Sequence, residues 1–128
     1  MSFRPLPRQV AELGIDDIYA IDTEYRPPEP DAYSRYDLSP DCAPAVFEPV
    51  CISVKSWATG RTESFWYHPG DPCLWNFDAT KLTAFFNAPA DLRFFLAAGW
   101  ELPSNIVDTY AEYRRAVNGL FDMHGKRV

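Results

Sequence analysis

The sequence predicts an α/β fold with a mixed β-sheet, in which an antiparallel hairpin is joined to parallel strands and flanked by helices. Apolar runs rich in β-branched and aromatic residues, without a helical period, indicate strands. The turn Thr59-Gly60-Arg61 separates two of these runs, as in a hairpin. Later runs alternate with helical segments, which is typical of parallel pairing. The predicted strands are Asp17–Tyr25, Val50–Ala58, Thr62–His68, Leu82–Phe86 and Ile106–Val107.

Composition limits the size and the class of the protein. A chain of 128 residues suits one domain, and 47% hydrophobic residues allow a core. A net charge of −6 argues against a module that grips DNA by phosphate contacts alone, because such modules are usually basic. The same charge is compatible with an enzyme whose carboxylates hold divalent metal ions.

Cysteine usage and hydropathy indicate the compartment. The odd number of cysteines, Cys42, Cys51 and Cys73, and the lack of a C-x-x-C pair predict neither a disulfide framework nor a zinc site. Free thiols are typical of the cytoplasm, where we expect the protein. The N-terminus lacks the apolar core of a signal peptide, and no apolar run approaches the ~18 residues that span a membrane.

The first half of the chain is expected to contain one long loop. A short helix should end at Gly14, before the first strand. The segment Arg26–Pro49 holds six prolines and no regular pattern, so we predict a loop there. Its Tyr33, Arg35 and Tyr36 are suited to touch a nucleotide by stacking or phosphate contact. A surface loop without a role fits these residues equally well.

In the second half, two helices are predicted. One covers Asp91–Ala98 and closes at Gly99, and the other starts at Thr109, forms a capping box with Glu112 and ends near Asn118-Gly119. The stretch Pro69–Lys81 is close to the minimum of ~10–12 residues for a crossover connection, so we expect it to lack a full crossover helix. We expect three apolar residues to cover the sheet instead: Leu74, Trp75 and Phe77.

Three carboxylates could form a metal site. Asp22 and Glu24 lie two apart on a strand, so both project from one face, and unpaired burial there would be costly. Asp91 follows the strand Leu82–Phe86 and Asn87, which would set it at the carboxyl edge, where open α/β sheets bind ligands. Carboxylate oxygens suit Mg²⁺. The alternatives are a solvated strand end and, for Asp91, a helix cap.

These segments together resemble a known family. IDTEY is similar to the first motif of the DEDD exonuclease superfamily, which has a ribonuclease H-like fold, and FNAPADLRFFL is similar to the second motif. IVDTYAEYRR resembles the segment after the second motif, and VCISVKSWATGRTESFWYHP resembles the hairpin between the motifs. The resemblance is strongest to the 3'-5' exonuclease domains of DNA polymerase I-type proteins, and it covers about Asp17–Gly119.

The resemblance implies a two-metal nuclease that uses Mg²⁺ or Mn²⁺ and acts on the 3' end of single-stranded DNA. Asp22 would bridge both ions, Glu24 would hold the ion that activates water, and Asp91 would bind the second ion. The nucleic-acid-binding residues implied by the motifs are Thr23, Tyr25 and Asn87. For Asp108, a packing or turn role is expected.

The chain departs from the family pattern at its end. The family has a fourth carboxylate in a late helix, and Asp122 and His124 do not match its spacing. We therefore expect residues 1–128 to be a partial exonuclease domain, whose partner would be a downstream polymerase domain. Whether this chain is active alone stays open. The alternatives are a non-catalytic exonuclease-like interaction module and a ribonuclease that trims short RNA. His68 is expected at the surface or in packing.

Overall fold

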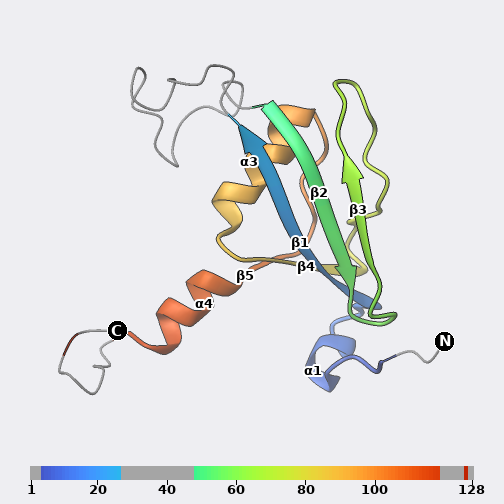
Figure 1. Cartoon of the computed structure of the whole chain (residues 1–128). Helices are drawn as coiled ribbons and strands as arrows, with labels where there is room; N and C mark the ends of the chain where they lie inside the picture. The colour runs from blue at the N-terminus through green and yellow to red at the C-terminus, as the bar shows by residue number, and fades with distance from the viewer. Residues whose placement is uncertain (1–3, 27–47, 119–125, 127–128) are drawn as a thin grey trace.

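A computed structural model describes residues 4–26, 48–118 and 126 of the chain. The order of its elements agrees with the alternation of strands and helices expected from the sequence (Figure 1). Their bounds are α1 Arg8–Ala11, β1 Asp17–Arg26, β2 Glu48–Ser56, β3 Thr62–Trp66, β4 Lys81–Phe85, α3 Ala88–Ala98, β5 Ile106–Asp108 and α4 Thr109–Ala116.

The strands form one mixed five-stranded sheet in the order β3-β2-β1-β4-β5. β1 pairs with β2, and β2 with β3, in antiparallel fashion, whereas β1–β4 and β4–β5 are parallel. The β2–β3 hairpin turns at Gly60, whose φ of 71° favours glycine. The prediction of an α/β fold with a hairpin joined to parallel strands is therefore confirmed.

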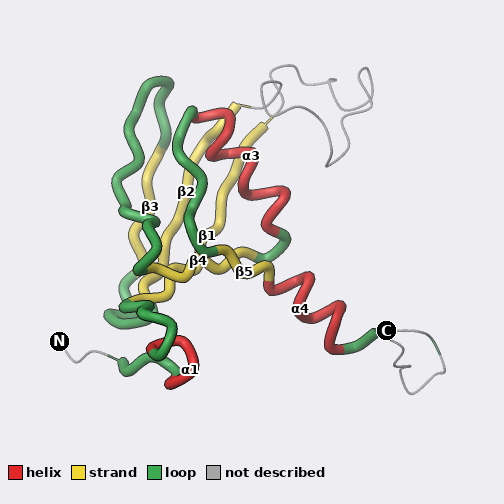
Figure 2. Tube along the Cα trace, turned by 180° about the vertical axis from the view of Figure 1, so that it is seen from behind, coloured by secondary structure: helices red, strands yellow, loops and turns green. Residues whose placement is uncertain are grey.

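The core lies between the sheet and α3, which packs against β1, β2, β4 and β5 (Figure 2). Phe94 and Phe95 of α3 are fully buried there. The residues of β1 alternate between the two faces of the sheet: Ile21 and Thr23 are buried, while Asp22 and Glu24 are exposed on the other face. This second face of β1 is turned away from the core beneath α3, and we call it the open face.

The connection from β3 to β4 contains no helix in the described structure, as its length predicted. Phe77 from this connection is buried in the core, and Trp75 stacks on it with ring centroids 6.3 Å apart. Phe77 also packs edge-on against Tyr19 of β1. The expectation for Leu74 was wrong, because this side chain is 59% exposed. Trp75 and Phe77 thus cover the part of the sheet that a crossover helix would cover.

Helix α3 starts three residues earlier than predicted. Its N-cap is Asn87, which has the left-handed conformation (φ 66°, ψ 69°), and Pro89 lies in the first turn, where a proline is tolerated. Asp91 therefore lies in the first turn and does not cap the helix. The predicted end at Gly99 is confirmed, since its φ of 73° is the left-handed conformation that commonly closes helices.

The predicted capping box of α4 was wrong, because Asp108 caps the helix. Its carboxylate accepts hydrogen bonds from the backbone N–H groups of Ala111 (3.0 Å), Ala88 (3.0 Å) and Asn87 (3.2 Å). The Thr109 hydroxyl donates to the Phe85 carbonyl, and Glu112 pairs with Arg115. The helix ends at Ala116, slightly before the predicted Asn118-Gly119, and α4 projects away from the sheet (Figures 1 and 2).

Asp108 joins the N-termini of α3 and α4, so its removal should destabilise the protein more than an ordinary cap. We expect Asp108→Ala to lower the free energy of unfolding by about 1–3 kcal/mol, because buried or half-buried N–H donors lose their acceptor. Glu112→Ala should change it by less than about 0.5 kcal/mol. Urea unfolding of both variants measures this. An equal decrease in the free energy of unfolding of the two variants would instead support the predicted capping box of Thr109 and Glu112.

Candidate metal centre

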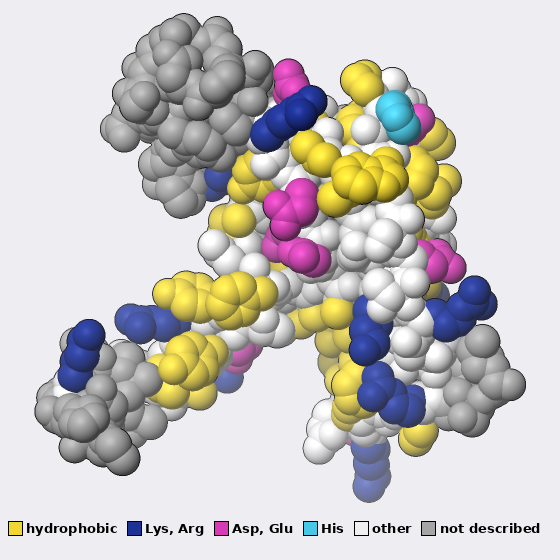
Figure 3. All heavy atoms as spheres, in the orientation of Figure 1, with side chains coloured by type: hydrophobic (Ala, Val, Ile, Leu, Met, Phe, Trp, Pro, Cys, Tyr) yellow, Lys and Arg dark blue, Asp and Glu magenta, His cyan; other side chains and the backbone are white. Residues whose placement is uncertain are grey.

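Asp22 and Glu24 lie side by side on the open face of β1. The parallel pairing of β1 with β4 ends at Ile21 opposite Phe85, so Asp22 is the first residue beyond the carboxyl end of β4. Both side chains are exposed, and neither accepts a hydrogen bond from another described residue. In the view of Figure 3, acidic side chains gather over β1. The position is the sheet edge where α/β proteins bind ligands.

Asp91 is buried, at 7% exposure, and is bound to the residue between Asp22 and Glu24. Its Oδ1 accepts hydrogen bonds from the Thr23 hydroxyl (2.6 Å) and the Thr23 backbone N–H (3.1 Å). None of the described residues donates to its Oδ2. The first turn of α3 is thereby fixed against β1, and the structure brings the three predicted carboxylates to one end of the sheet.

The electrostatics of Asp91 are set mainly by its burial and by the hydrogen bonds from Thr23. Burial raises the pKa of Asp91, the two Thr23 hydrogen bonds act in the opposite direction, and the charges of Asp22 and Glu24 raise this pKa further. The net pKa is above the ordinary value. A divalent cation near these carboxylates would relieve both the desolvation and the repulsion.

The three carboxylates do not form a preformed metal cage. Across residues 4–26 and 48–118, no group of three or more His, Cys, Asp or Glu side chains is placed to hold a metal ion. The donor chemistry fits Mg²⁺ or Mn²⁺, which take carboxylate oxygens and, for Mg²⁺, keep several waters. Asp22 and Glu24 are exposed and can rotate, whereas Asp91 is fixed by Thr23.

The residues expected to contact nucleic acid have different surroundings. Thr23 is on the buried face and uses its hydroxyl on Asp91, so its evident role is to position that carboxylate. Tyr25 is half-buried and its hydroxyl accepts a hydrogen bond from Arg93 of α3 (3.3 Å). The Asn87 side chain makes no cap hydrogen bond. Contact of Tyr25 and Asn87 with nucleic acid stays a prediction.

Two carboxylates at the N-terminal ends of α3 and α4 have opposite electrostatics. Burial raises the pKa of Asp108, but hydrogen bonds from backbone N–H groups outweigh it, so the net pKa is lowered. Asp108 is therefore held as a structural anion, in line with the packing role expected for it. Asp91 is held by one residue and has a raised pKa, which is the pattern more often found at functional sites.

Sequence reasoning missed Cys51 as a neighbour of the site. Cys51 is the antiparallel partner of Glu24, so their side chains share the open face. Burial raises the pKa of its thiol, and the charges of Glu24 and Asp22 add to this. Cys51 and Cys73 are both free thiols. Only the register of β2 against β1, which the sequence does not specify, would have placed Cys51 beside Glu24.

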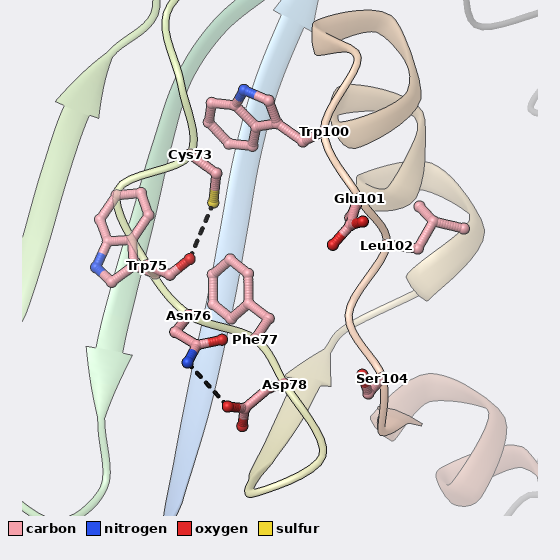
Figure 4. Close-up of a pocket in the computed structure, with 9 residues that line it drawn as sticks. All are labelled: Cys73, Trp75, Asn76, Phe77, Asp78, Trp100, Glu101, Leu102 and Ser104. Atoms are coloured by element: carbon pink, nitrogen blue, oxygen red, sulfur yellow. Dashed lines mark hydrogen bonds between the residues drawn. The ribbon is translucent and has the colours of Figure 1, made fainter.

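A pocket of about 350 Å³ lies away from the carboxylates, between the segment before β4 and the segment after α3 (Figure 4). It includes Asp78 and Ser104, which precede β4 and β5, so it lies toward the amino ends of these parallel strands. Ligands of α/β sheets bind at the other end. Its other lining residues are Cys73, Trp75, Asn76, Phe77, Trp100, Glu101 and Leu102.

Several candidates fall elsewhere. His68 is a surface residue with 80% of its side chain exposed, as expected. The ends of the predicted loop Arg26–Pro49 belong to β1 and β2. Its Tyr33, Arg35 and Tyr36, and also Asp122 and His124, lie outside the described residues. No helix in the described part of the chain is long and apolar enough to cross a membrane.

Comparison with known proteins assigns no family. No protein-family model matches the chain, and neither the curated proteins nor the solved structures gave a significant match.

The raised pKa of Asp91 predicts a pH-dependent gain from neutralising it. In the folded state this carboxyl binds a proton at higher pH than when unfolded, so its ionisation reduces stability above the folded pKa. Asp91→Asn should raise the melting temperature at pH 8, because the amide oxygen still accepts from Thr23. The gain should shrink as the pH falls toward the ordinary pKa of Asp.

The control for this measurement is Glu63→Gln, an exposed carboxylate on β3. Thermal unfolding between pH 4 and pH 8 is measured for both variants and the parent. A melting temperature of Asp91→Asn that stays below the parent at pH 8 would show that the ionised carboxylate stabilises the fold.

Proposed function

We propose that Asp22, Glu24 and Asp91 bind divalent cations, Mg²⁺ or Mn²⁺, in a nuclease that removes nucleotides from the 3' end of single-stranded DNA. The observation that carries this proposal is the pair of hydrogen bonds from Thr23 to Asp91, which fixes the third carboxylate against the residue that separates Asp22 from Glu24. The proposed protein is the exonuclease part of a DNA polymerase, with the polymerase domain as its partner.

The topology supports this function. The sheet order β3-β2-β1-β4-β5, with three antiparallel strands followed by two parallel ones, is compatible with a ribonuclease H-like arrangement. In that arrangement the first strand is central and carries the first carboxylate. Here β1 is the central strand and carries Asp22 and Glu24.

Asp22, Glu24 and Asp91 would have different roles at the proposed metal site. Bound divalent ions would neutralise phosphate charge and lower the pKa of a water molecule. Asp22 and Glu24, exposed on one face, would hold these ions from the strand. Asp91, fixed through Oδ1 by Thr23, would present Oδ2 from the helix. The raised pKa of Asp91 means that metal binding must displace its proton at low pH, so affinity should fall with acidification.

A non-catalytic interaction module is the second candidate. It is favoured by the absence of a preformed group of three ligands in the part of the chain that the structure describes. In this case Asp22 and Glu24 would contribute only surface charge, Asp91 would only fix α3 to β1, and replacement of Asp22 or Glu24 would leave metal affinity unchanged. Ribonuclease activity on short RNA uses the same metal chemistry, so an RNA substrate belongs in the same assay.

Metal binding and cleavage can be tested with Asp22→Ala. We expect the parent to bind Mn²⁺ in a titration followed by electron paramagnetic resonance, and the variant to bind it at least about 10-fold more weakly. With 5'-labelled single-stranded DNA or RNA, any 3'-end trimming should be roughly 100-fold slower in the variant, since several kcal/mol of charge stabilisation is lost.

Glu63→Gln serves as the control in both measurements and should behave like the parent. Metal binding is read independently of turnover, so the test remains decisive if the chain alone is inactive. Equal Mn²⁺ affinity of the parent and Asp22→Ala would reject the metal centre and leave the interaction module.

A further inference from the structure

The open face contains a hollow of about 270 Å³ directly beside Asp22. It lies on the sheet surface between β1 and the β2–β3 hairpin. Its composition differs from the acidic strand end, because it combines one cation with two hydroxyl groups. The lining residues are Ala20, Ile21, Asp22, Ser53, Lys55 and Thr62.

The strand register explains why these groups meet. Asp22 is opposite Ser53, and Ala20 is opposite Lys55, which in turn is opposite Thr62. Residues opposite one another share a face, so all of them project from the open face. Lys55 is the diagonal neighbour of Asp22, at roughly 7–8 Å between backbone positions, which is within reach of a long side chain.

Lys55 is exposed and makes no hydrogen bond or ion pair with any other described residue. Ser53 shares a hydrogen bond with Ser64 (2.8 Å), which places its hydroxyl in the same row as Asp22. A flexible ammonium group with neighbouring hydroxyls is a common set of donors for a phosphate. The chain therefore offers phosphate donors next to its candidate metal carboxylate.

Positive charge continues along this face away from Asp22. A second, smaller hollow of about 70 Å³ is lined by Lys55, Arg4 and Trp57, together with Ile18 and Ala20. The Arg4 guanidinium lies 4.3 Å from the centre of the Trp57 ring, which holds it over the sheet. Figure 3 shows Lys and Arg side chains below the acidic group on the same side of the molecule.

We propose that the hollow at Lys55 binds a backbone phosphate of single-stranded nucleic acid, adjacent to the phosphate held at the metal centre. This inference rests on the proposed function and gives the strand a direction, from Asp22 toward Arg4. The shared chemistry is the phosphodiester, which DNA and RNA both supply. One cationic contact releases about 0.7 counterion from a single strand, which makes the proposal measurable.

The test is the binding of 5'-fluorescein-labelled six-nucleotide thymidine and uridine oligomers, followed by fluorescence anisotropy against salt concentration. We expect Lys55→Gln to bind about 5-fold more weakly at 0.1 M salt and to reduce the slope of log K against log salt by about 0.7. Arg115→Gln, which removes an exposed cation from α4, should keep both the affinity and the slope. Circular dichroism checks that each variant is folded.

Each titration is run with Ca²⁺ and again with EDTA, which separates this inference from the metal centre. A slope change in both conditions, with no strengthening of binding by Ca²⁺, would support the phosphate site while counting against the metal centre. A slope change with only one polymer would support the site and identify that polymer as its ligand. An unchanged slope with both polymers, or no oligomer binding by the parent, would overturn the inference.

Discussion

The two-residue repeat of β1 is the constraint on which the rest of the structure depends. It sends Ile21 and Thr23 toward α3 and leaves Asp22 and Glu24 on the open face. Because Thr23 lies between the two acids, its hydrogen bonds to Asp91 fix the helix at the point where the acids emerge. A shift of one residue in the register would bury both acids and expose the core side chains. Core packing and the candidate site are therefore specified by the same strand.

This arrangement buries Asp91, and its charged form is less stable in the folded protein than in the unfolded chain. Asp91 is buried and feels two neighbouring negative charges, yet it has one donor residue, whereas Asp108 has backbone donors from two helices. An ordinary structural carboxylate would be expected to resemble Asp108. A group kept at a cost to stability is instead typical of a residue whose charge is needed for binding. This contrast within one molecule favours function for Asp91.

The features that local patterns specify were predicted well. The hairpin and Gly60, the end of α3 at Gly99 and the placement of Asp22 with Glu24 all follow from contacts within a few residues. The start of α3 was missed because Asn87 adopts a left-handed conformation, which its side chain tolerates but does not dictate. The cap of α4 was missed because Asp108 also serves Asn87 and Ala88, some twenty residues earlier. Cys51 and Lys55 gain their places only from cross-strand register, which the sequence does not display.

The distribution of charge accounts for how an acidic protein could still approach nucleic acid. A net charge of −6 repels phosphates at long range. On the open face, however, the acids Asp22 and Glu24 lie toward the carboxyl end of β1, whereas Lys55 and Arg4 lie toward its amino end. Metal ions would reverse the sign of the acidic end, so this end would become attractive to phosphates only in their presence. Binding of a phosphate at the acidic end would then depend on loading the metal site first. In that order of events, the acidity that argues against a simple DNA-binding module becomes a means of coupling substrate affinity to the metal.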